Sequence, residues 1–345
     1  MRVLVIGGTG FIGPWVVTDL IRRDKEVAVF HRGSTASVLP SSVPHITGDR
    51  RAIADAAAQI RAFKPDVVID VILSSGMQAR DIMSIVRGMA QRIVAVSSID
   101  VYRACAVFHG LERGPLEPLP LTEESPVRSQ GQTYSREQIS RLQQVFGWLD
   151  DEYDKIPVER EVLSDPELPG TVLRLPMVYG PGDPLHRCFP LLKRMDDRRP
   201  AILFEEKAAL WRGPRAYVEN VAASISLAAT SERASGRVYN VAESKCLSEL
   251  EWARKIAKAA DWHGEFVTVP GERAPAFLKN PGNMDQHWVA DSSRIRNELD
   301  YRELIDPHEA IEWTLAWERS HPPSQIDARQ FDYAAEDAFL GGFHH

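Results

Sequence analysis

The feature of this sequence that most constrains its fold is a run of glycines near the start of the chain. Gly7, Gly10 and Gly13 stand at three-residue spacing in "VLVIGGTGFIGPWVVTDLIRR", after an apolar segment and before an amphipathic one. In a strand–turn–helix unit the first glycine allows a tight turn, the second lets a pyrophosphate approach, and the third lets helix pack on strand. The helix start offers free N–H groups to phosphates. The residues expected to contact a dinucleotide are Gly7, Thr9, Gly10, Phe11, Ile12 and Gly13.

Short apolar runs alternate with amphipathic ones over the first hundred residues. "RVLVIG", "EVAVF", "DVVIDVI" and "RIVAVSS" are typical of strands, and "IADAAAQIRAF" and "MQARDIMSIVRGMA" of the helices between them. Strands that are apolar almost throughout indicate a parallel sheet covered on both faces. We therefore predict an α/β fold with a doubly wound parallel sheet of the Rossmann type, with ligands at the carboxyl ends of the strands.

After residue 101 this rhythm ends, and a segment rich in Pro, Ser and Glu indicates a long surface insertion. Further helices and strands predict a smaller, discontinuous C-terminal lobe. We expect residues 1–175 and 215–243 to form the dinucleotide-binding domain and residues 176–214 and 244–325 to form the substrate-binding lobe. Residues 326–345 are expected to be a loosely packed tail. The two final histidines fit either a native end or a tag remnant.

Bulk composition limits the partners. The net charge of −7 and the pI of about 5.8 disfavour nucleic acid as a partner. No apolar run reaches transmembrane length, and no signal-peptide pattern opens the chain, so we expect a cytoplasmic protein with no membrane partner. Cys105, Cys188 and Cys246 are expected to be free thiols. Cys and His spacings suit no metal, so we expect none. A small-molecule substrate is expected, and a homodimer is left open.

The residues after the second strand bear on the choice of cofactor. "EVAVF" ends at His31 and Arg32, where an NAD site usually carries an acidic residue for the ribose 2′-hydroxyl. Without that acid, a 2′-phosphate could be held by Arg32, with Ser34 and Thr35 as further donors. We predict NADP, with NAD as the alternative. The residues expected around the adenosine end are His31, Arg32, Ser34, Asp49 and Arg50.

Several motifs together resemble the extended short-chain dehydrogenase/reductase family, of the NAD-dependent epimerase/dehydratase type. "GGTGFIG" matches its cofactor motif, and "VSSIDVY" looks like its fifth strand with the catalytic serine, here Ser98. "LRLPMVYGPGDP", "RAYVENVAASI" and "GRVYNVAE" resemble later landmarks, so the similarity covers roughly residues 1–320. "FHRG" is similar to an atypical branch that includes chloroplast stem-loop RNA-binding proteins. A cap at a strand end is the alternative role for Ser98, and Asp100 is either an additional acid or a cap.

The resemblance implies a catalytic tyrosine with a lysine four residues on, which shares its helix face and lowers its pKa. None of the eight tyrosines here has that lysine. Tyr153 leads into a helix and then the strand-like "TVLRL", which is the family's order, so we predict Tyr153 as the catalytic residue and keep Tyr134 as the alternative. The fourth residue after Tyr153 is Pro157, which favours a helix start or kink nearby. Lys155 is the nearest cation, and an irregular first turn could bring it to the cofactor.

The resemblance also places two arginines at the substrate. Arg187 follows the sixth strand, and Arg215 is similar to a substrate arginine of the family. We expect an NADP-linked oxidoreductase or an epimerase/dehydratase-like enzyme acting on a small hydroxyl or carbonyl compound, such as a sugar nucleotide. Ser98 would hydrogen-bond the reacting oxygen and Tyr153 would exchange its proton. Two alternatives stay open: a non-catalytic cofactor-binding sensor or scaffold, and an RNA-binding relative.

Overall fold

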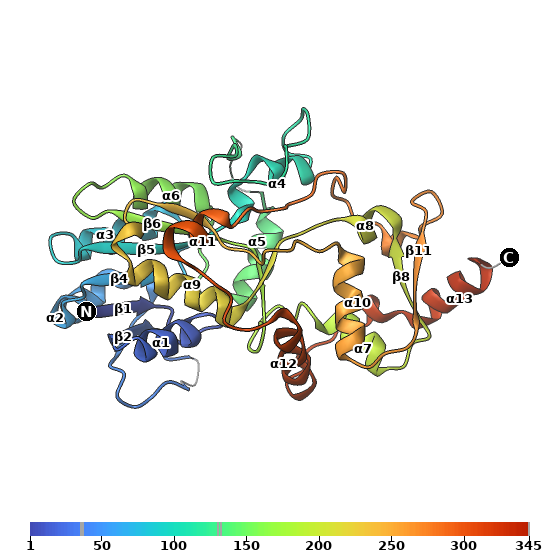
Figure 1. Ribbon diagram of the computed structural model, residues 1–345, viewed down its shortest axis with the longest axis horizontal. Coiled ribbons are helices and arrows are strands. Elements are labelled where there is room, and N and C mark those ends of the chain that lie inside the picture. The colour runs from blue at the N-terminus through green and yellow to red at the C-terminus, as the bar shows by residue number, and fades with distance from the viewer. Residues whose placement is uncertain (35–37, 130, 132, 344–345) are drawn as a thin grey trace.

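A parallel sheet of seven strands forms the centre of the molecule, in the order β10-β6-β5-β4-β1-β2-β3 (Figure 1). The computed structural model describes residues 1–34, 38–129, 131 and 133–343; Thr35, His344 and His345 lie outside these residues. The strands are β1 (Arg2–Ile6), β2 (Glu26–His31), β3 (His45–Thr47), β4 (Val67–Asp70), β5 (Arg92–Ser98), β6 (Gly170–Leu175) and β10 (Val238–Asn240). All neighbouring pairs run parallel.

Alternating side chains along the strands supply an apolar core on each face of the sheet. The covering helices are α1 (Gly13–Arg22), α3 (Gly76–Val86), α6 (Lys155–Leu163) and α9 (Val218–Thr230). Val3 and Val5 of β1 join the core that includes residues of α1 and α9. Leu4 and Ile6 join the core that includes residues of α3 and α6. Successive strand residues point to opposite faces, so helices cover both, and the predicted doubly wound sheet is confirmed.

A smaller lobe lies to the right of the sheet in Figure 1. A parallel strand pair, β7 (Met177–Tyr179) with β9 (Arg215–Tyr217), lies against α9. The smaller lobe contains a second parallel pair, β8 (Ala201–Glu205) with β11 (Glu265–Val269). Its helices are α7 (Phe189–Asp196), α8 (Glu206–Leu210), α10 (Glu249–Ala259) and α12 (Pro307–Ser320). Strand β8 was not predicted, because a strand of five residues has too short an apolar pattern to be recognised without its partner strand.

The other short elements lie between these strands and helices along the chain. They are η1 (Arg50–Ala56), α2 (Ala57–Phe63), η2 (Ile99–Val101), α4 (Arg103–Phe108), α5 (Arg136–Val145), η3 (Glu232–Ala234), η4 (Ala276–Leu278) and α11 (Ser293–Leu299). Helix α5 belongs to the long insertion and stands between the sheet and the smaller lobe in Figure 1. Its Ser135 side chain and Gln138 form a reciprocal cap at its start, which satisfies backbone donors there.

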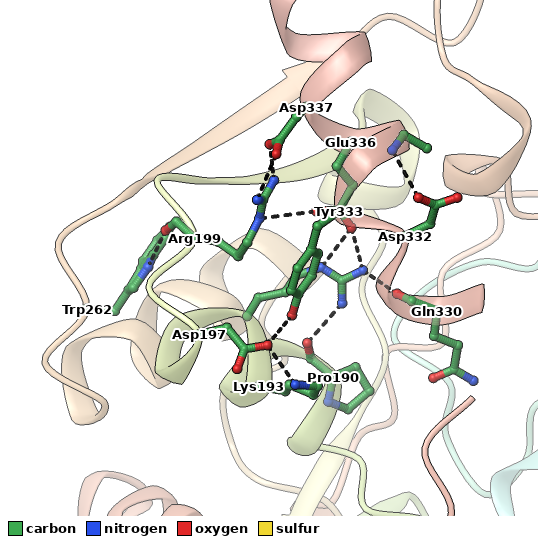
Figure 2. A network of polar contacts seen from close by, with 12 residues as sticks. Pro190, Lys193, Asp197, Arg199, Trp262, Gln330, Asp332, Tyr333, Glu336 and Asp337 are labelled. Atoms are coloured by element: carbon green, nitrogen blue, oxygen red, sulfur yellow. Dashed lines mark hydrogen bonds and ion pairs between the residues drawn. The ribbon is translucent and has the colours of Figure 1, made fainter. Parts of the chain in front are cut away.

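The C-terminal segment is held by polar contacts, in contrast to the loosely packed tail expected from the sequence. It forms η5 (Ala328–Phe331) and α13 (Tyr333–Phe343). Arg194 pairs with Glu336 at 2.8 Å, and the Tyr333 hydroxyl donates to Asp197 at 2.6 Å. Figure 2 shows these contacts around Arg199, which also pairs with Asp337. The ion pairs join α13 to α7 and the turn that follows it.

Two further observations concern the whole described chain. Cys105 and Cys188 are buried, Cys246 is half-buried, and all three are free thiols. Among the described residues no helix combines the length and the apolar character needed to cross a bilayer.

Candidate active site

Of the glycines in the turn after β1, only Gly10 has room for an added Cβ. Gly7 has a φ of +82°, which favours glycine. A Cβ on Gly13 would lie 2.2 Å from the Gly7 carbonyl oxygen, whereas a Cβ on Gly10 would meet nothing nearer than 3.7 Å. Ile12 caps α1 without a side-chain hydrogen bond, so the first N–H groups of the helix have no side-chain cap. These features fit the pyrophosphate of a dinucleotide.

Arg32 lies just beyond β2 and contacts a distant part of the chain. Its Nη1 donates to the Gly147 carbonyl at 2.9 Å. His31 Nδ1 accepts from the Gly33 N–H at 3.0 Å, so its Nε2 is the donor to His45 at 2.7 Å. Both ring nitrogens of His31 are therefore engaged, while Arg32 and Ser34 are exposed beside it. Arg32 has enough N–H donors to bind a phosphate without losing its contact to Gly147.

Asp49 and Arg50 occupy different environments. Asp49 accepts from the Arg51 backbone N–H at 2.9 Å and pairs with its side chain at 2.7 Å, which lowers the Asp49 pKa. Arg50 is fully buried and pairs with Asp70 at 2.8 Å. Burial raises the Asp70 pKa, and the Arg50 charge opposes that shift. The expected contact between Arg50 and adenine does not fit this placement, because the guanidinium lies beneath the surface.

Two tyrosines from separate segments reach one buried carboxyl group. The hydroxyls of Tyr134 and Tyr153 lie 3.4 and 3.5 Å from Oδ2 of Asp100, and their ring centroids are 6.0 Å apart. Asp100 is 4% exposed, and its Oδ1 makes no hydrogen bond within the described structure. Ser98 Oγ accepts from the Asp100 N–H at 3.2 Å, so the serine caps the turn that carries the acid. Ser98, Asp100 and both candidate tyrosines thus form one cluster, which we call the tyrosine–acid cluster.

Lys155 is buried beside this cluster rather than exposed to solvent. It is the first residue of α6, after the cap residue Asp154, and its ammonium group donates to the carbonyls of Leu73 and Val96. Burial lowers the pKa of Lys155 to about 8, opposed by the charge of Asp100. Pro157 is the third residue of α6, where its missing N–H would have no helical partner in any case.

The environment of the two tyrosines favours the neutral phenol. Burial is the largest cause that raises the pKa of Tyr153 well above its usual value, and the neighbouring charge of Asp100 adds to it. The same two causes raise the Tyr134 pKa well above its usual value. Burial also raises the pKa of Asp100. At neutral pH both phenols therefore keep their protons and can serve as donors.

A buried polar network beneath the cluster fixes the strands that carry it. Glu159 of α6 accepts from Ser97 at 2.6 Å and pairs with Arg174 at 2.7 Å. The Tyr102 hydroxyl donates to Asn240 at 2.7 Å, which joins the turn after β5 to β10. Paired and hydrogen-bonded groups of this kind hold one geometry. The sequence signal for Glu159 was its place four residues after Lys155, one turn along the same helix.

The two predicted substrate arginines already have carboxylate partners. Arg187 donates to Asp183 at 2.6 Å. Arg215 pairs with Glu249 at 2.6 Å and lies 4.9 Å from the ring centroid of Trp252. Neither has a contact to the tyrosine–acid cluster among the described interactions. Among the described residues, no group of three or more His, Cys, Asp or Glu side chains is arranged to hold a metal ion.

The fold and the glycine turn define a protein of the Rossmann-type nucleotide-binding class. The chain belongs to the NAD dependent epimerase/dehydratase family, whose sequence profile matches residues 3–242. This match confirms the resemblance that the motifs suggested. The family and the related proteins indicate an NAD(P)-dependent enzyme of the epimerase, dehydratase and reductase group.

Several characterised proteins are similar over most of the chain. A 2′-dehydrokanamycin reductase of Streptomyces kanamyceticus is 26% identical, over 85% of this chain and 75% of its own length. The chloroplast stem-loop binding protein of 41 kDa b of Arabidopsis thaliana is 21% identical, over 90% and 77%. The UDP-glucose 4-epimerase of Thermus thermophilus, solved with NAD, is 21% identical with a TM-score of 0.62, over 93% of this chain and all of its own. The structural likeness shows the shared fold.

Proposed function

We propose that this chain is an NADP-linked reductase of a carbonyl group on a small polyhydroxylated compound, with Tyr153 as the proton donor. The observation that carries the proposal is the approach of Tyr153 and Tyr134 to the same buried Asp100 oxygen, at 3.5 and 3.4 Å. The cluster follows β5, at the edge of the sheet where this fold binds ligands. A neutral phenol beside the reacting oxygen can protonate it as hydride arrives.

The raised pKa of Tyr153 favours reduction over oxidation at neutral pH. Reduction of a ketone needs the protonated phenol, which is the form that burial stabilises here. Oxidation of an alcohol needs the phenolate, which the buried position disfavours. The relative from Streptomyces kanamyceticus, a reductase by name, supports the same direction.

The residues toward the cofactor follow from the glycine turn and the end of β2. Gly7, Gly10 and Gly13 would hold the pyrophosphate, and Arg32 would hold a 2′-phosphate, which favours NADP over NAD. Bound NADPH supplies the hydride. Ser98 would hydrogen-bond the substrate oxygen, and the Lys155 charge would stabilise the phenolate that forms on Tyr153.

The substrate proposal is a ketone on a small ring that carries several hydroxyl groups, with a sugar nucleotide as the second candidate. The name of the reductase relative favours the former, and the UDP-glucose 4-epimerase of the same fold, which by name acts on a UDP-sugar, favours the latter. If the substrate is a sugar nucleotide, Arg187 and Arg215 would bind its diphosphate. The diphosphate would then have to displace Asp183 and Glu249, their present partners. A panel of both substrate types therefore separates the two.

The test combines calorimetric titration of NADP and NAD with NADPH oxidation on that panel, including 2′-dehydrokanamycin and UDP-linked 4-ketosugars. The proposal expects tighter binding of NADP and turnover of at least one ketone. Cofactor binding without turnover of any carbonyl compound would favour a non-catalytic sensor. Salt-sensitive binding of stem-loop RNA without binding of either dinucleotide would favour an RNA-binding protein.

A further inference from the structure

The segment that carries the predicted catalytic tyrosine also contacts the predicted 2′-phosphate residue. Residues 146–154, which we call the connecting segment, join α5 to α6. At its start the Gly147 carbonyl accepts from Arg32 at 2.9 Å. A Cβ on Gly147 would lie 2.8 Å from Nη1 of Arg32, so an alanine here would push the flexible Arg32 side chain away from the carbonyl. Tyr153 stands six residues farther along the same segment.

The middle of the connecting segment is fixed to the turn after β4. The Asp150 N–H donates to Ser74 Oγ at 2.8 Å, and the Ser75 hydroxyl donates to the Asp150 carboxylate at 2.6 Å. Farther along, the Asp154 N–H donates to the Ser74 carbonyl at 3.0 Å. The segment thus has one anchor at the end of β2 and a second at the end of β4.

These two anchors lie on either side of the glycine turn. Strand β1 stands between β2 and β4 in the sheet, and the glycine turn follows β1. The carboxyl ends of parallel strands meet at one edge, so the connecting segment runs past the edge where the dinucleotide would bind. Its position links the adenosine end of that site to the tyrosine–acid cluster.

The hydrogen bond from Arg32 to the Gly147 carbonyl lies at the surface. A second ligand of Arg32, such as a phosphate, would therefore affect its strength. In α5, just before the connecting segment, only Ile139 is buried among the helix residues, which leaves this part of the chain with few apolar contacts. A guanidinium has five N–H donors, so Arg32 can keep the Gly147 carbonyl while it donates to a phosphate. A phosphate that fixes Arg32 would therefore also fix Gly147.

We infer that Gly147 and Asp150 are positioning residues of the cofactor site, and that recognition of a 2′-phosphate by Arg32 holds the connecting segment and Tyr153 in place. This inference rests on the proposed use of NADP. Beyond a difference in affinity, NADP would hold Tyr153 in place, whereas NAD would not. Neither residue would touch the reacting atoms; both would act through the chain that leads to Tyr153.

Hydrogen–deuterium exchange of the full-length protein tests the inference, with the amides of residues 146–154 followed without cofactor, with saturating NADP and with saturating NAD. We expect NADP to slow this exchange about tenfold or more in the wild type, because its phosphate adds a charge-assisted contact to Arg32. NAD should slow it much less. In Gly147→Ala, NADP should still bind more tightly than NAD, but its effect on residues 146–154 should be lost.

The outcomes separate this inference from the proposed function. If calorimetry detects binding of neither dinucleotide, the proposed cofactor and the coupling both fail. If NADP binds tightly yet protects residues 146–154 no better than NAD, the coupling is overturned and the cofactor proposal stands. If Gly147→Ala keeps the full NADP-dependent protection, the contact between Arg32 and Gly147 is not the link. Asp150→Asn, which keeps the size and one acceptor oxygen, should retain most of the protection, whereas Asp150→Ala should lose it.

Discussion

The ammonium group of Lys155 lies 5.6 Å from the ring centroid of Tyr153, two positions earlier in the sequence. In a regular helix a separation of two would put them on different faces. Tyr153 precedes the helix here, Asp154 caps it, and Lys155 begins it. The extended backbone of Asp154 therefore lets both side chains turn inward. Lys155 thus lies near the tyrosine although it follows it by two residues and not by four.

The depressed pKa of Lys155 predicts a specific dependence of stability on pH. Its pKa is about 8 in the folded protein and about 10.5 when unfolded. Between these values the unfolded state binds the extra proton, so the free energy of unfolding rises with pH through this window. Relative to Lys155→Met, the wild type should gain up to about 3 kcal/mol from pH 8 to pH 10.5. Urea unfolding at several pH values measures this. A constant difference between the two proteins would show that Lys155 titrates normally.

Arg32→Ala should abolish the preference for NADP. The substitution removes the proposed phosphate contact, worth roughly 1.5–3 kcal/mol, so NADP affinity should fall about tenfold or more while NAD affinity changes little. Titration calorimetry with both cofactors measures the effect. Arg51→Ala is the matched control, because Arg51 is an exposed arginine nearby that pairs with Asp49. Equal losses for both cofactors in Arg32→Ala would contradict the assignment.

Gly10→Val should fold but lose cofactor binding, because the space beside Gly10 is open in the protein and would be needed by the pyrophosphate. Gly13→Val is the contrasting variant. Its Cβ would lie 2.2 Å from the Gly7 carbonyl oxygen, so it should fail to fold. Circular dichroism and cofactor titration distinguish the two effects. Normal NADP binding by Gly10→Val would place the pyrophosphate elsewhere.

Arg50→Met should destabilise the protein strongly, by about 3–5 kcal/mol, because it leaves the carboxylate of Asp70 buried without its partner. Arg51→Met changes the next residue, which is exposed, and should cost little. Thermal and urea unfolding compare the two variants. A small loss in Arg50→Met would contradict the prediction that a charged Asp70 depends on Arg50.

The sequence was sufficient to predict the elements that depend on local pattern. Apolar strands such as β1 and the spacing of Gly7, Gly10 and Gly13 identify the fold because each signal is contained in one short stretch. Short strands such as β8 were missed, because their stability comes from the partner strand β11, whose paired residues lie 64 positions away (Ala201 with Glu265).

The candidate site could be predicted only in part. Ser98 and Tyr153 followed from motif order, but the meeting of Tyr134 and Tyr153 at Asp100 depends on how the insertion folds back. Arg50 was expected to meet the adenosine end of the cofactor from its place after the third strand, whereas the ion pair with Asp70 takes it inside. Burial of a charged side chain depends on a partner that is distant in the sequence, so local pattern does not reveal it.

The role of Tyr153 as proton donor is tested most directly by the rate of NADPH oxidation with a ketone that the wild type reduces, compared in Tyr153→Phe and Tyr134→Phe. Phenylalanine keeps the ring and removes the proton, so Tyr153→Phe should lose about 100-fold or more in turnover with nearly unchanged NADPH affinity. Tyr134→Phe should lose less, because it removes only the second contact to Asp100. Wild-type turnover in Tyr153→Phe would contradict the account.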